Sequence, residues 1–204
     1  MINIPDDDEF LTDLILQRTR PFIRLCGKEA LADWTRTGNR KGLVTALRLN
    51  DAVDNYLAAA MSEIAADVAD YCEAIGSRTA GRFVSIGCGN GIAEVMLWRR
   101  FRFDSVLLVD TETGGKGHGF GQTAAGYGNL RRAADLMRDN GVTCAAKTWN
   151  PAKEPDPTFR FNVLVSMYAM GFHFPADAYD GFIEANRLPG AIVIHDSRDG
   201  RVCR

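Results

Sequence analysis

The chain has 204 residues, 46% of them hydrophobic and 25% charged, which is enough for one folded domain with a hydrophobic core. A formal net charge of -2 gives no overall attraction to nucleic acid or to an anionic membrane, so we expect neither as a partner. The N-terminus lacks a signal-peptide pattern, and no hydrophobic run is long enough to span a membrane. The five cysteines contain no CxxC pair, and the three histidines have no neighbour at metal-ligand spacing. We therefore expect a cytoplasmic protein without a disulfide framework or a bound metal.

Residues 1–80 are predicted to form an N-terminal helical cap. The acidic segment Asp6–Asp8 can cap the start of a first helix, whose hydrophobic positions continue until Pro21 interrupts the pattern. A second helical piece is interrupted at Thr37–Asn39. From Asn50 onward, hydrophobic residues recur every three or four positions until Gly76, which predicts one long amphipathic helix packed against a core.

Residues 81–204 are predicted to form an α/β domain, because short β-branched runs alternate with helical patterns. The predicted strands are 82–86, 105–110, 143–149, 161–168 and 191–196. The predicted helices are 92–101, 127–141 and a helix with its exit turn within 175–190. Five strands alternating with helices predict a Rossmann-like, open and mainly parallel sheet with helices on both faces.

Three glycines follow the first predicted strand at every second position, namely Gly87, Gly89 and Gly91. Ligands of such sheets bind at this strand-to-helix turn, and glycine allows positive φ and close approach of a ligand to backbone N–H groups. The alternative, a tight turn with close helix packing, needs one glycine rather than three. Asp110 ends the second strand, where a carboxylate can accept hydrogen bonds from both hydroxyls of an adenosine ribose. Its alternative role is that of a turn or helix-capping residue.

The sequence VSIGCGNG at 84–91 resembles the first motif of class I S-adenosylmethionine-dependent methyltransferases. LLVDTE at 107–112 is similar to their ribose-binding strand end, and RLPGAIVIHD at 187–196 to the start of their fifth strand. Residues 126–142 and 163–179 look most like bacterial sugar or polysaccharide O-methyltransferases. The resemblance implies S-adenosylmethionine as the cofactor and an oxygen acceptor on a small molecule or sugar. A dinucleotide fingerprint has its third glycine one residue later, which makes an NAD-dependent oxidoreductase the weaker alternative.

The resemblance also implies roles for individual residues. The expected cofactor-binding residues are Ser85, Gly87, Cys88, Gly89, Asn90, Gly91, Asp110, Thr111, Trp149, Asn150 and Ser166. Among these, Asp110 would hold the ribose and Thr111 would flank the adenine. Asn150 would contact the adenine amino group, while Trp149 would either stack on the base or pack in the core. Ser166, with Met167 and Tyr168 after it, would face the transferred methyl group.

Two departures from the family pattern matter. Ser85 stands where many relatives carry an acid, so main-chain carbonyls or another acid must hold the methionine amino group. The sequence ends eight residues after Asp196, where the family adds two antiparallel strands, so we expect a C-terminal hairpin that is reduced or absent. An exposed sheet edge invites pairing with a second chain, which predicts a homodimer.

The expected catalytic residues are His173, Tyr168 and Asp196, which follow the fourth strand or end the fourth and fifth strands. His173 is either a general base or a packing residue of an aromatic loop. His195 is expected to be a structural hydrogen-bonding residue. A different hypothesis is a non-catalytic module that binds S-adenosylmethionine or a nucleotide without turnover.

The segment 111–128 contains seven glycines and is either flexible or a lid over the cofactor. As a lid, it would make contacts through four polar side chains: His118, Gln122, Tyr127 and Asn129.

Overall fold

The computed structural model describes residues 2–77, 81–112, 127–197 and 201–203, and contains a single six-stranded sheet in that part of the chain. The strands run in the order β3-β2-β1-β4-β5-β6, and the first five are parallel to one another. Their bounds are β1 (Arg82–Ile86), β2 (Ser105–Val109), β3 (Ala145–Trp149), β4 (Phe161–Ser166), β5 (Arg187–Asp196) and β6 (Val202–Cys203). The predicted α/β class and mainly parallel sheet are confirmed.

The central strands β1, β2 and β4 are hydrophobic runs that are buried along almost their whole length. Such runs suit a parallel sheet whose two faces are both covered by helices. The strand order reverses between β1 and β4, because the chain passes from β1 to β2 and β3 on one side and then to β4 and β5 on the other. Open α/β sheets bind ligands outside the carboxyl ends of the strands at such a reversal.

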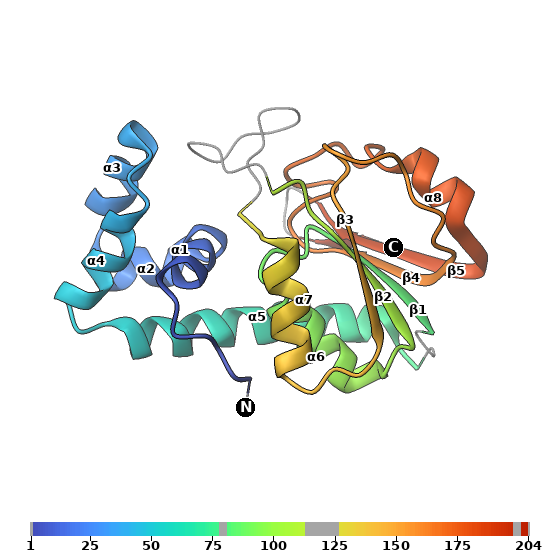
Figure 1. Ribbon diagram of the computed structural model, residues 1–204, viewed down its shortest axis with the longest axis horizontal. Helices are drawn as coiled ribbons and strands as arrows, with labels where there is room; N and C mark the ends of the chain where they lie inside the picture. Colours follow the sequence, from blue (N-terminus) through green and yellow to red (C-terminus); the bar gives the residue numbers. More distant parts are fainter. Residues whose placement is uncertain (1, 78–80, 113–126, 198–200, 204) are drawn as a thin grey trace.

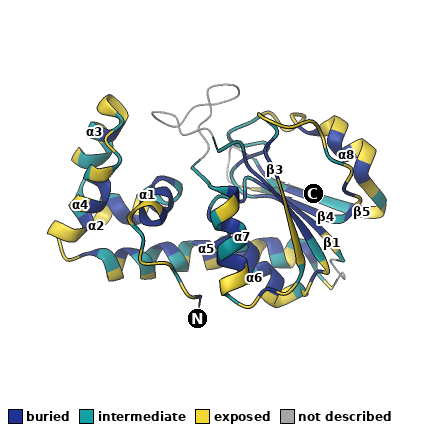
Figure 2. Ribbon diagram, in the orientation of Figure 1, coloured by how far each residue is buried: buried dark blue, intermediate teal, exposed yellow. Residues whose placement is uncertain are grey.

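Helices cover both faces of the sheet (Figure 1). One hydrophobic cluster joins β1, β2 and β4 to α6 (Ile92–Phe101) and α7 (Leu130–Asp139), as well as to the N-terminal helices. The other joins the opposite faces of the same strands to α8 (Asp180–Asn186). Figure 2 shows the result: the central strands are mostly buried, whereas β3 at the edge of the sheet and the outer sides of the helices are exposed.

The N-terminal region forms five helices and no strand in its described residues, which agrees with the predicted helical cap. It contains α1 (Asp8–Gln17), α2 (Thr19–Cys26), α3 (Glu29–Thr37), α4 (Lys41–Leu49) and α5 (Val53–Ile75). Helix α5 continues from the small helices into the sheet region, where it packs against α6 and β5 (Figure 1). Tyr71 in its last third donates a hydrogen bond from its hydroxyl to the carbonyl of Ser166, at 2.7 Å. The long helix therefore belongs to both the cap and the sheet.

Several element bounds differ from the predictions. The first helix ends before Arg18, whose φ is −130°, and not at Pro21. Pro21 lies in the first turn of α2, where backbone N–H groups have no hydrogen-bond partner within the helix, so proline is tolerated there. Helix α4 had no separate prediction. Strand β5 begins at Arg187 rather than at 191, with an irregular register opposite Phe161–Val163. Strand β6 has two residues, paired antiparallel with His195 and Asp196, so the C-terminal pairing is reduced, as predicted.

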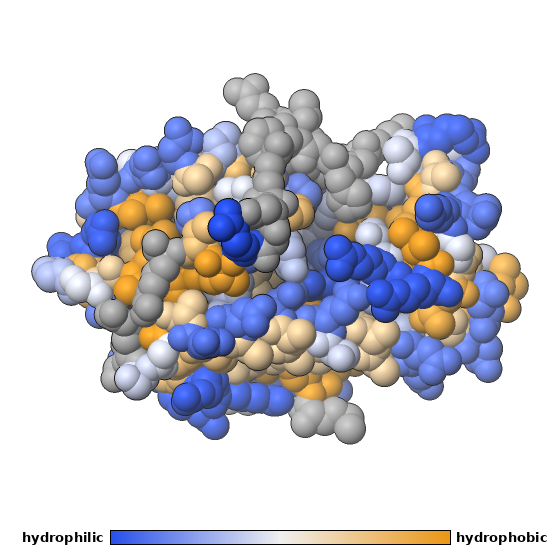
Figure 3. Space-filling model, turned by 180° about the vertical axis from the view of Figure 1, so that it is seen from behind, coloured by the Kyte–Doolittle hydropathy of each residue, from blue (hydrophilic) through white to orange (hydrophobic). Residues whose placement is uncertain are grey.

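The surface of the molecule carries both polar and hydrophobic side chains (Figure 3). Figure 3 shows hydrophilic and hydrophobic residues interspersed over the face seen from behind. In the described part of the chain, no helix is both long and hydrophobic enough to cross a membrane.

Candidate functional site

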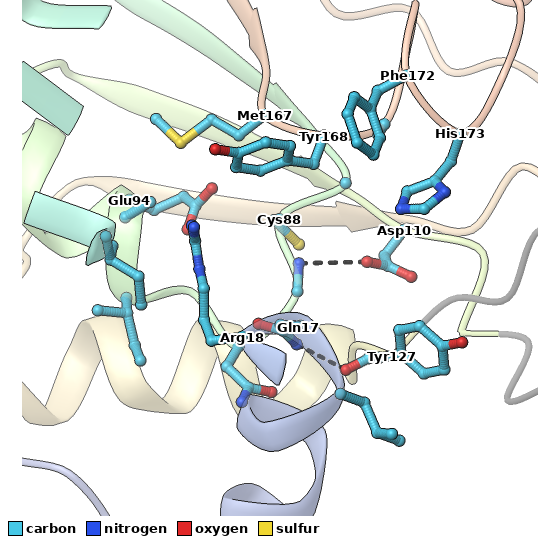
Figure 4. Close-up of a pocket in the computed structure, with 18 of the residues that line it drawn as sticks. Gln17, Arg18, Cys88, Glu94, Asp110, Tyr127, Met167, Tyr168, Phe172 and His173 are labelled. Atoms are coloured by element: carbon cyan, nitrogen blue, oxygen red, sulfur yellow. Dashed lines mark hydrogen bonds between the residues drawn. The ribbon is translucent and has the colours of Figure 1, made fainter. Parts of the chain in front are cut away.

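A cavity of about 420 Å³ lies at the carboxyl ends of β1, β2 and β4, where the strand order reverses. Its sheet-side wall is the turn after β1 together with the ends of β2 and β4. Its opposite wall comes from the junction of α1 and α2 and from the middle of α5 (Figure 4). This volume is in the range of pockets that bind small molecules and cofactors.

The turn after β1 depends on glycine at two positions that line the cavity. Gly87 and Gly89 have φ values of +76° and +55°, a region that other residues rarely adopt. A Cβ at Gly87 would lie 2.5 Å from the Cβ of Ala169, and one at Gly89 would lie 2.8 Å from Oε1 of Gln17. The backbone N–H groups of Gly87 and Cys88 donate to the carbonyl of Val109, which fastens the turn to the end of β2. The bare backbone of this turn therefore forms one side of the cavity.

Gly91 has a different role from the other two glycines and does not line the cavity. Its φ is +80°, and a Cβ there would lie 2.8 Å from the carbonyl oxygen of Ala133 in α7. The third glycine of the motif thus lets α6 pack closely against α7.

Asp110 lies against the glycine turn at the end of β2. Its Oδ2 accepts a hydrogen bond from the N–H of Gly89 at 3.2 Å, and its Oδ1 accepts one from the N–H of Glu112 at 2.9 Å. Burial raises the pKa of Asp110 to about 6, although these two N–H groups favour the ionised form. A Cβ at Gly128 would lie 2.6 Å from Oδ2, so the chain entering α7 passes close to this carboxylate.

Ser85 does not line the cavity, but it holds a carboxylate that does. Its hydroxyl donates to Oε1 of Glu94 at 2.5 Å, and both residues are buried. Glu94 lies in the first turn of α6 and lines the cavity. Burial raises the pKa of Glu94 to about 7, while the Ser85 hydroxyl favours its ionised form. Through this hydrogen bond, Ser85 orients a carboxylate that reaches the cavity from the following helix.

Tyr168 lies two residues after the end of β4 and is held from several sides. Its φ is +54°, which is strained for a residue with a side chain. Its N–H donates to Oδ2 of Asp196 at 2.8 Å, and its hydroxyl donates to Oδ1 of Asp67 at 3.0 Å. The guanidinium of Arg18 lies 5.1 Å from the centre of its ring and is ion-paired with Asp67 at 2.5 Å. The position of Tyr168 is therefore fixed jointly by the end of β5, by the junction of α1 and α2, and by α5.

His173 lines the cavity in the loop after β4. Its backbone N–H donates to the carbonyl of Ala169 at 2.9 Å, and its ring packs edge-on against Phe172 at 4.9 Å. In Figure 4 its imidazole lies toward the Asp110 end of the cavity.

Most of the predicted cofactor residues meet at this cavity. Those that line it, together with two of the expected catalytic residues, are Gly87, Cys88, Gly89, Asn90, Asp110, Thr111, Tyr168 and His173. Six other predicted site residues lie outside its lining: Ser85, Gly91, Trp149, Asn150, Ser166 and Asp196. Asp196 contacts the lining residue Tyr168, whose backbone N–H donates to its carboxylate.

Trp149 and Asn150 at the end of β3 have other partners. Trp149 packs against Phe182 and Tyr179 in the core beside α8, with ring centres 4.9 and 6.1 Å away. Asn150 donates to the carbonyl of Thr111 and to Oε2 of Glu112, and it lines a separate surface groove.

Ser166 is fully buried beneath the cavity. Its hydroxyl oxygen accepts the N–H of Met170 at 2.8 Å, and its carbonyl accepts the Tyr71 hydroxyl.

Of the residues considered as lid contacts, His118 and Gln122 lie outside the described residues. Tyr127 lines the cavity, and its carbonyl accepts a hydrogen bond from the side chain of Gln17 at 2.7 Å. Asn129 caps the N-terminus of α7 by accepting the N–H of Arg132.

Sequence reasoning missed Arg18, Asp67 and Glu94. Asp67 and Glu94 each stand next to a hydrophobic helix position, Val68 and Val95, but such a neighbour does not specify whether the acid itself is buried.

Comparison with known proteins gives distant structural similarities. No known protein family matches the sequence, and no curated protein is significantly similar to it. Among solved structures, the S-adenosylmethionine-dependent methyltransferase SibL is 14% identical with a TM-score of 0.47, over 94% of this chain and 57% of that chain. The plantazolicin methyltransferase BpumL in complex with SAH is 14% identical with a TM-score of 0.40, over 89% and 63%. YjhP from E. coli is 15% identical with a TM-score of 0.44, over 64% and 47%. The chain thus spans about half to two thirds of their lengths. These similarities are too distant to transfer residue roles, so the chemistry of the site has to be inferred from the residues of this chain.

Proposed function

We propose that the protein is an S-adenosylmethionine-dependent methyltransferase that methylates an oxygen atom of a small molecule or sugar. The observation that carries this proposal is the pairing of Asp110 with the glycine turn, 3.2 Å from the N–H of Gly89, in a cavity at the strand-order reversal. A carboxylate and bare backbone at this point suit the ribose of an adenosine ligand. The glycine spacing and the antiparallel β6 favour this ligand over NAD, because NAD-binding domains have a sheet made of two parallel halves.

The cofactor supplies an activated methyl group on a sulfonium, so the protein needs to align the acceptor and exclude water. Asp110 would orient the ribose through hydrogen bonds from its hydroxyls. Met167, Tyr168 and Phe172 would enclose the reacting atoms, because they line the cavity where the cap closes over the end of β4. When bound, the cofactor would supply the methyl group, and these three residues would hold the acceptor oxygen in line with it.

The proton of an acceptor hydroxyl requires a base, for which we propose His173. Its support is its place on the cavity lining, in the loop that follows Tyr168. Replacing His173 with glutamine should then lower kcat with little change in the affinity for S-adenosylhomocysteine.

The acceptor would enter from the cap side, where Arg18, Thr19 and Glu63 contribute polar groups to the cavity. We also propose a homodimer, because β6 covers only the last two residues of the ten-residue strand β5 in the described part of the chain. Light scattering tests this assembly, and a monomeric mass would contradict it.

The decisive experiment for the cofactor is calorimetric titration with S-adenosylhomocysteine. We expect binding by the unchanged protein and a loss of about 30-fold or more in the Asp110→Ala variant, since a charged acceptor of two hydrogen bonds is removed. Unchanged affinity in that variant, or tighter binding of NAD than of S-adenosylhomocysteine, would overturn the proposal. Binding without turnover on any acceptor would instead support the non-catalytic module.

A further inference from the structure

Two buried acceptor atoms in the cavity wall have no hydrogen-bond partner. In the described part of the chain, Oε2 of Glu94 and Oδ1 of Asn90 are the only buried side-chain polar atoms in this condition. Both residues line the same cavity, Asn90 in the glycine turn just before α6 and Glu94 in the first turn of α6. Buried polar atoms are nearly always hydrogen-bonded, because leaving one unpaired destabilises the protein. A ligand that brings several N–H or O–H donors to this wall would satisfy both atoms.

Both acceptors are held in place by other groups. The side-chain amide of Asn90 donates to the carbonyl of Phe10 at 3.3 Å, which orients its oxygen away from that contact. The hydroxyl of Ser85 donates to Oε1 of Glu94 at 2.5 Å and leaves Oε2 as the unpaired oxygen. The arrangement is therefore a positioned pair of acceptors rather than two freely rotating side chains.

The charge of Glu94 is also unbalanced. Within the described residues, Glu94 has no ion pair, and the nearby cavity residue Arg18 is paired with Asp67 at 2.5 Å. Burial raises the pKa of Glu94 to about 7, with a small contribution from the charge of Asp110. A buried carboxylate is stabilised in its ionised form by a cation. An ammonium group matches both needs, because it has a positive charge and three donors.

The place of Glu94 relative to Asp110 identifies which ammonium group fits. Figure 4 shows the two carboxylates on opposite sides of Cys88, so one ligand can reach both along the glycine turn. We infer that Glu94, oriented by Ser85 and assisted by Asn90, binds the α-ammonium group of S-adenosylmethionine while Asp110 binds the ribose. This inference rests on the proposed function. The acid that binds the ammonium group would then lie in helix α6 of this chain, whereas the family pattern places an acid in the strand at the position of Ser85.

The test compares two ligands that differ only in the amino group. Calorimetric titration is carried out with S-adenosylhomocysteine and with its desamino analogue, in which hydrogen replaces that group. The unchanged protein should bind S-adenosylhomocysteine about 10- to 100-fold more tightly, as expected for a charge-assisted hydrogen bond. In the Glu94→Gln variant, which keeps the side-chain volume, this preference should largely disappear because only S-adenosylhomocysteine binds more weakly. The Ser85→Ala variant should show a smaller loss of preference.

The controls separate this inference from folding and from the proposed function. Glu73→Gln makes the same chemical change at an exposed position of α5 and should leave the preference unchanged. The affinity of Glu94→Gln for the desamino analogue reports whether its adenosine site is intact. An equal loss for both ligands, no loss, or no preference in the unchanged protein would overturn the role of Glu94 and leave the proposed function standing. If the unchanged protein bound neither ligand, the proposed function itself would be wrong.

Discussion

The two walls of the cavity differ in how their carboxylates are balanced. On the sheet side, Asp110 and Glu94 are buried and receive hydrogen bonds only from N–H groups and a hydroxyl, with no cation among the described residues. On the cap side, the acids lie behind the lining: Asp67 is ion-paired with the lining residue Arg18, and the buried Asp13 contacts Arg40. The difference indicates that the sheet wall leaves its charges for a ligand to balance, whereas the acids behind the cap wall are balanced within the protein and hold Arg18 in place.

The largest effect is expected where the sheet wall depends on the backbone. Gly91→Ala should lower the free energy of unfolding by about 2–4 kcal/mol, because its positive φ is disfavoured for alanine and the new Cβ would meet the backbone of α7. Gly141→Ala is a matched control, since its φ is +77° but no heavy atom lies within 4 Å of the added Cβ. It should cost only about 1 kcal/mol in urea denaturation. Equal losses would show that packing at α7 does not support this wall.

The unbalanced carboxylates predict a pH-dependent affinity. The raised pKa values, about 6 for Asp110 and about 7 for Glu94, mean that both groups hold protons near pH 5 in the unliganded protein. Ribose hydroxyls and an ammonium group favour the ionised forms, so binding releases protons and strengthens as the pH rises. We expect affinity for S-adenosylhomocysteine to rise about 10- to 100-fold between about pH 5 and pH 8. Calorimetry over this range measures it, and a flat profile would contradict the contrast between the walls.

The same pKa values predict the opposite trend for folding. In the unfolded chain, the two carboxyl groups have their ordinary pKa values of 3.8 and 4.5. Between these values and the native pKa values of about 6 and about 7, the native state binds more protons than the unfolded state. The stability of the unliganded protein should therefore fall as the pH rises through this window. In the Glu94→Gln variant, the upper part of this fall should be lost in melting curves recorded across the window.

A smaller effect is expected from the Arg18–Asp67 ion pair at the cap wall. Asp67→Asn leaves Arg18 without its counter-charge and should destabilise the protein by about 1–2 kcal/mol, since both side chains are partly exposed. Its affinity for S-adenosylhomocysteine should stay unchanged, while its KM for an acceptor should rise. A weakened cofactor affinity comparable to that of Asp110→Ala would show that the walls do not act separately.

The smallest effect is expected at the point where the walls meet. Tyr168→Phe keeps the ring beside Arg18 and removes only the hydroxyl that donates to Asp67, which should cost about 1 kcal/mol in urea denaturation. A much larger loss would mean that this hydrogen bond, and not the Arg18–Asp67 pair, joins the cap to the sheet.

The fold and the sheet wall could be predicted from the sequence because their determinants are local. The runs that form β1, β2 and β4 are short and hydrophobic, and Gly87, Gly89 and Asp110 lie directly after such runs. Local pattern could not separate the packing role of Gly91, because its neighbour Ala133 lies 42 positions further along the chain in α7. Trp149 at the end of β3 is similar, since its packing depends on where α8 lies.

The cap wall could not be predicted, because its contacts join distant segments. Arg18 and Asp67 are separated by 49 residues, and Asp67 and Tyr168 by 101. Each of these side chains alone is an ordinary charged or aromatic residue of a helix or loop. Glu94 lies between these cases: it is only nine positions from Ser85, but its role depends on a burial that the helix pattern does not specify.

The shared helix α5 restricts how this architecture can vary. Its 23 residues form an unbroken rod of about 34 Å that carries the cap at one end and contacts β5 near the other. The cap therefore cannot swing open as a hinged unit without bending the rod. Under the proposed function, exchanging the short helices before residue 50 while keeping α5 and the α/β region should change which acceptor is methylated.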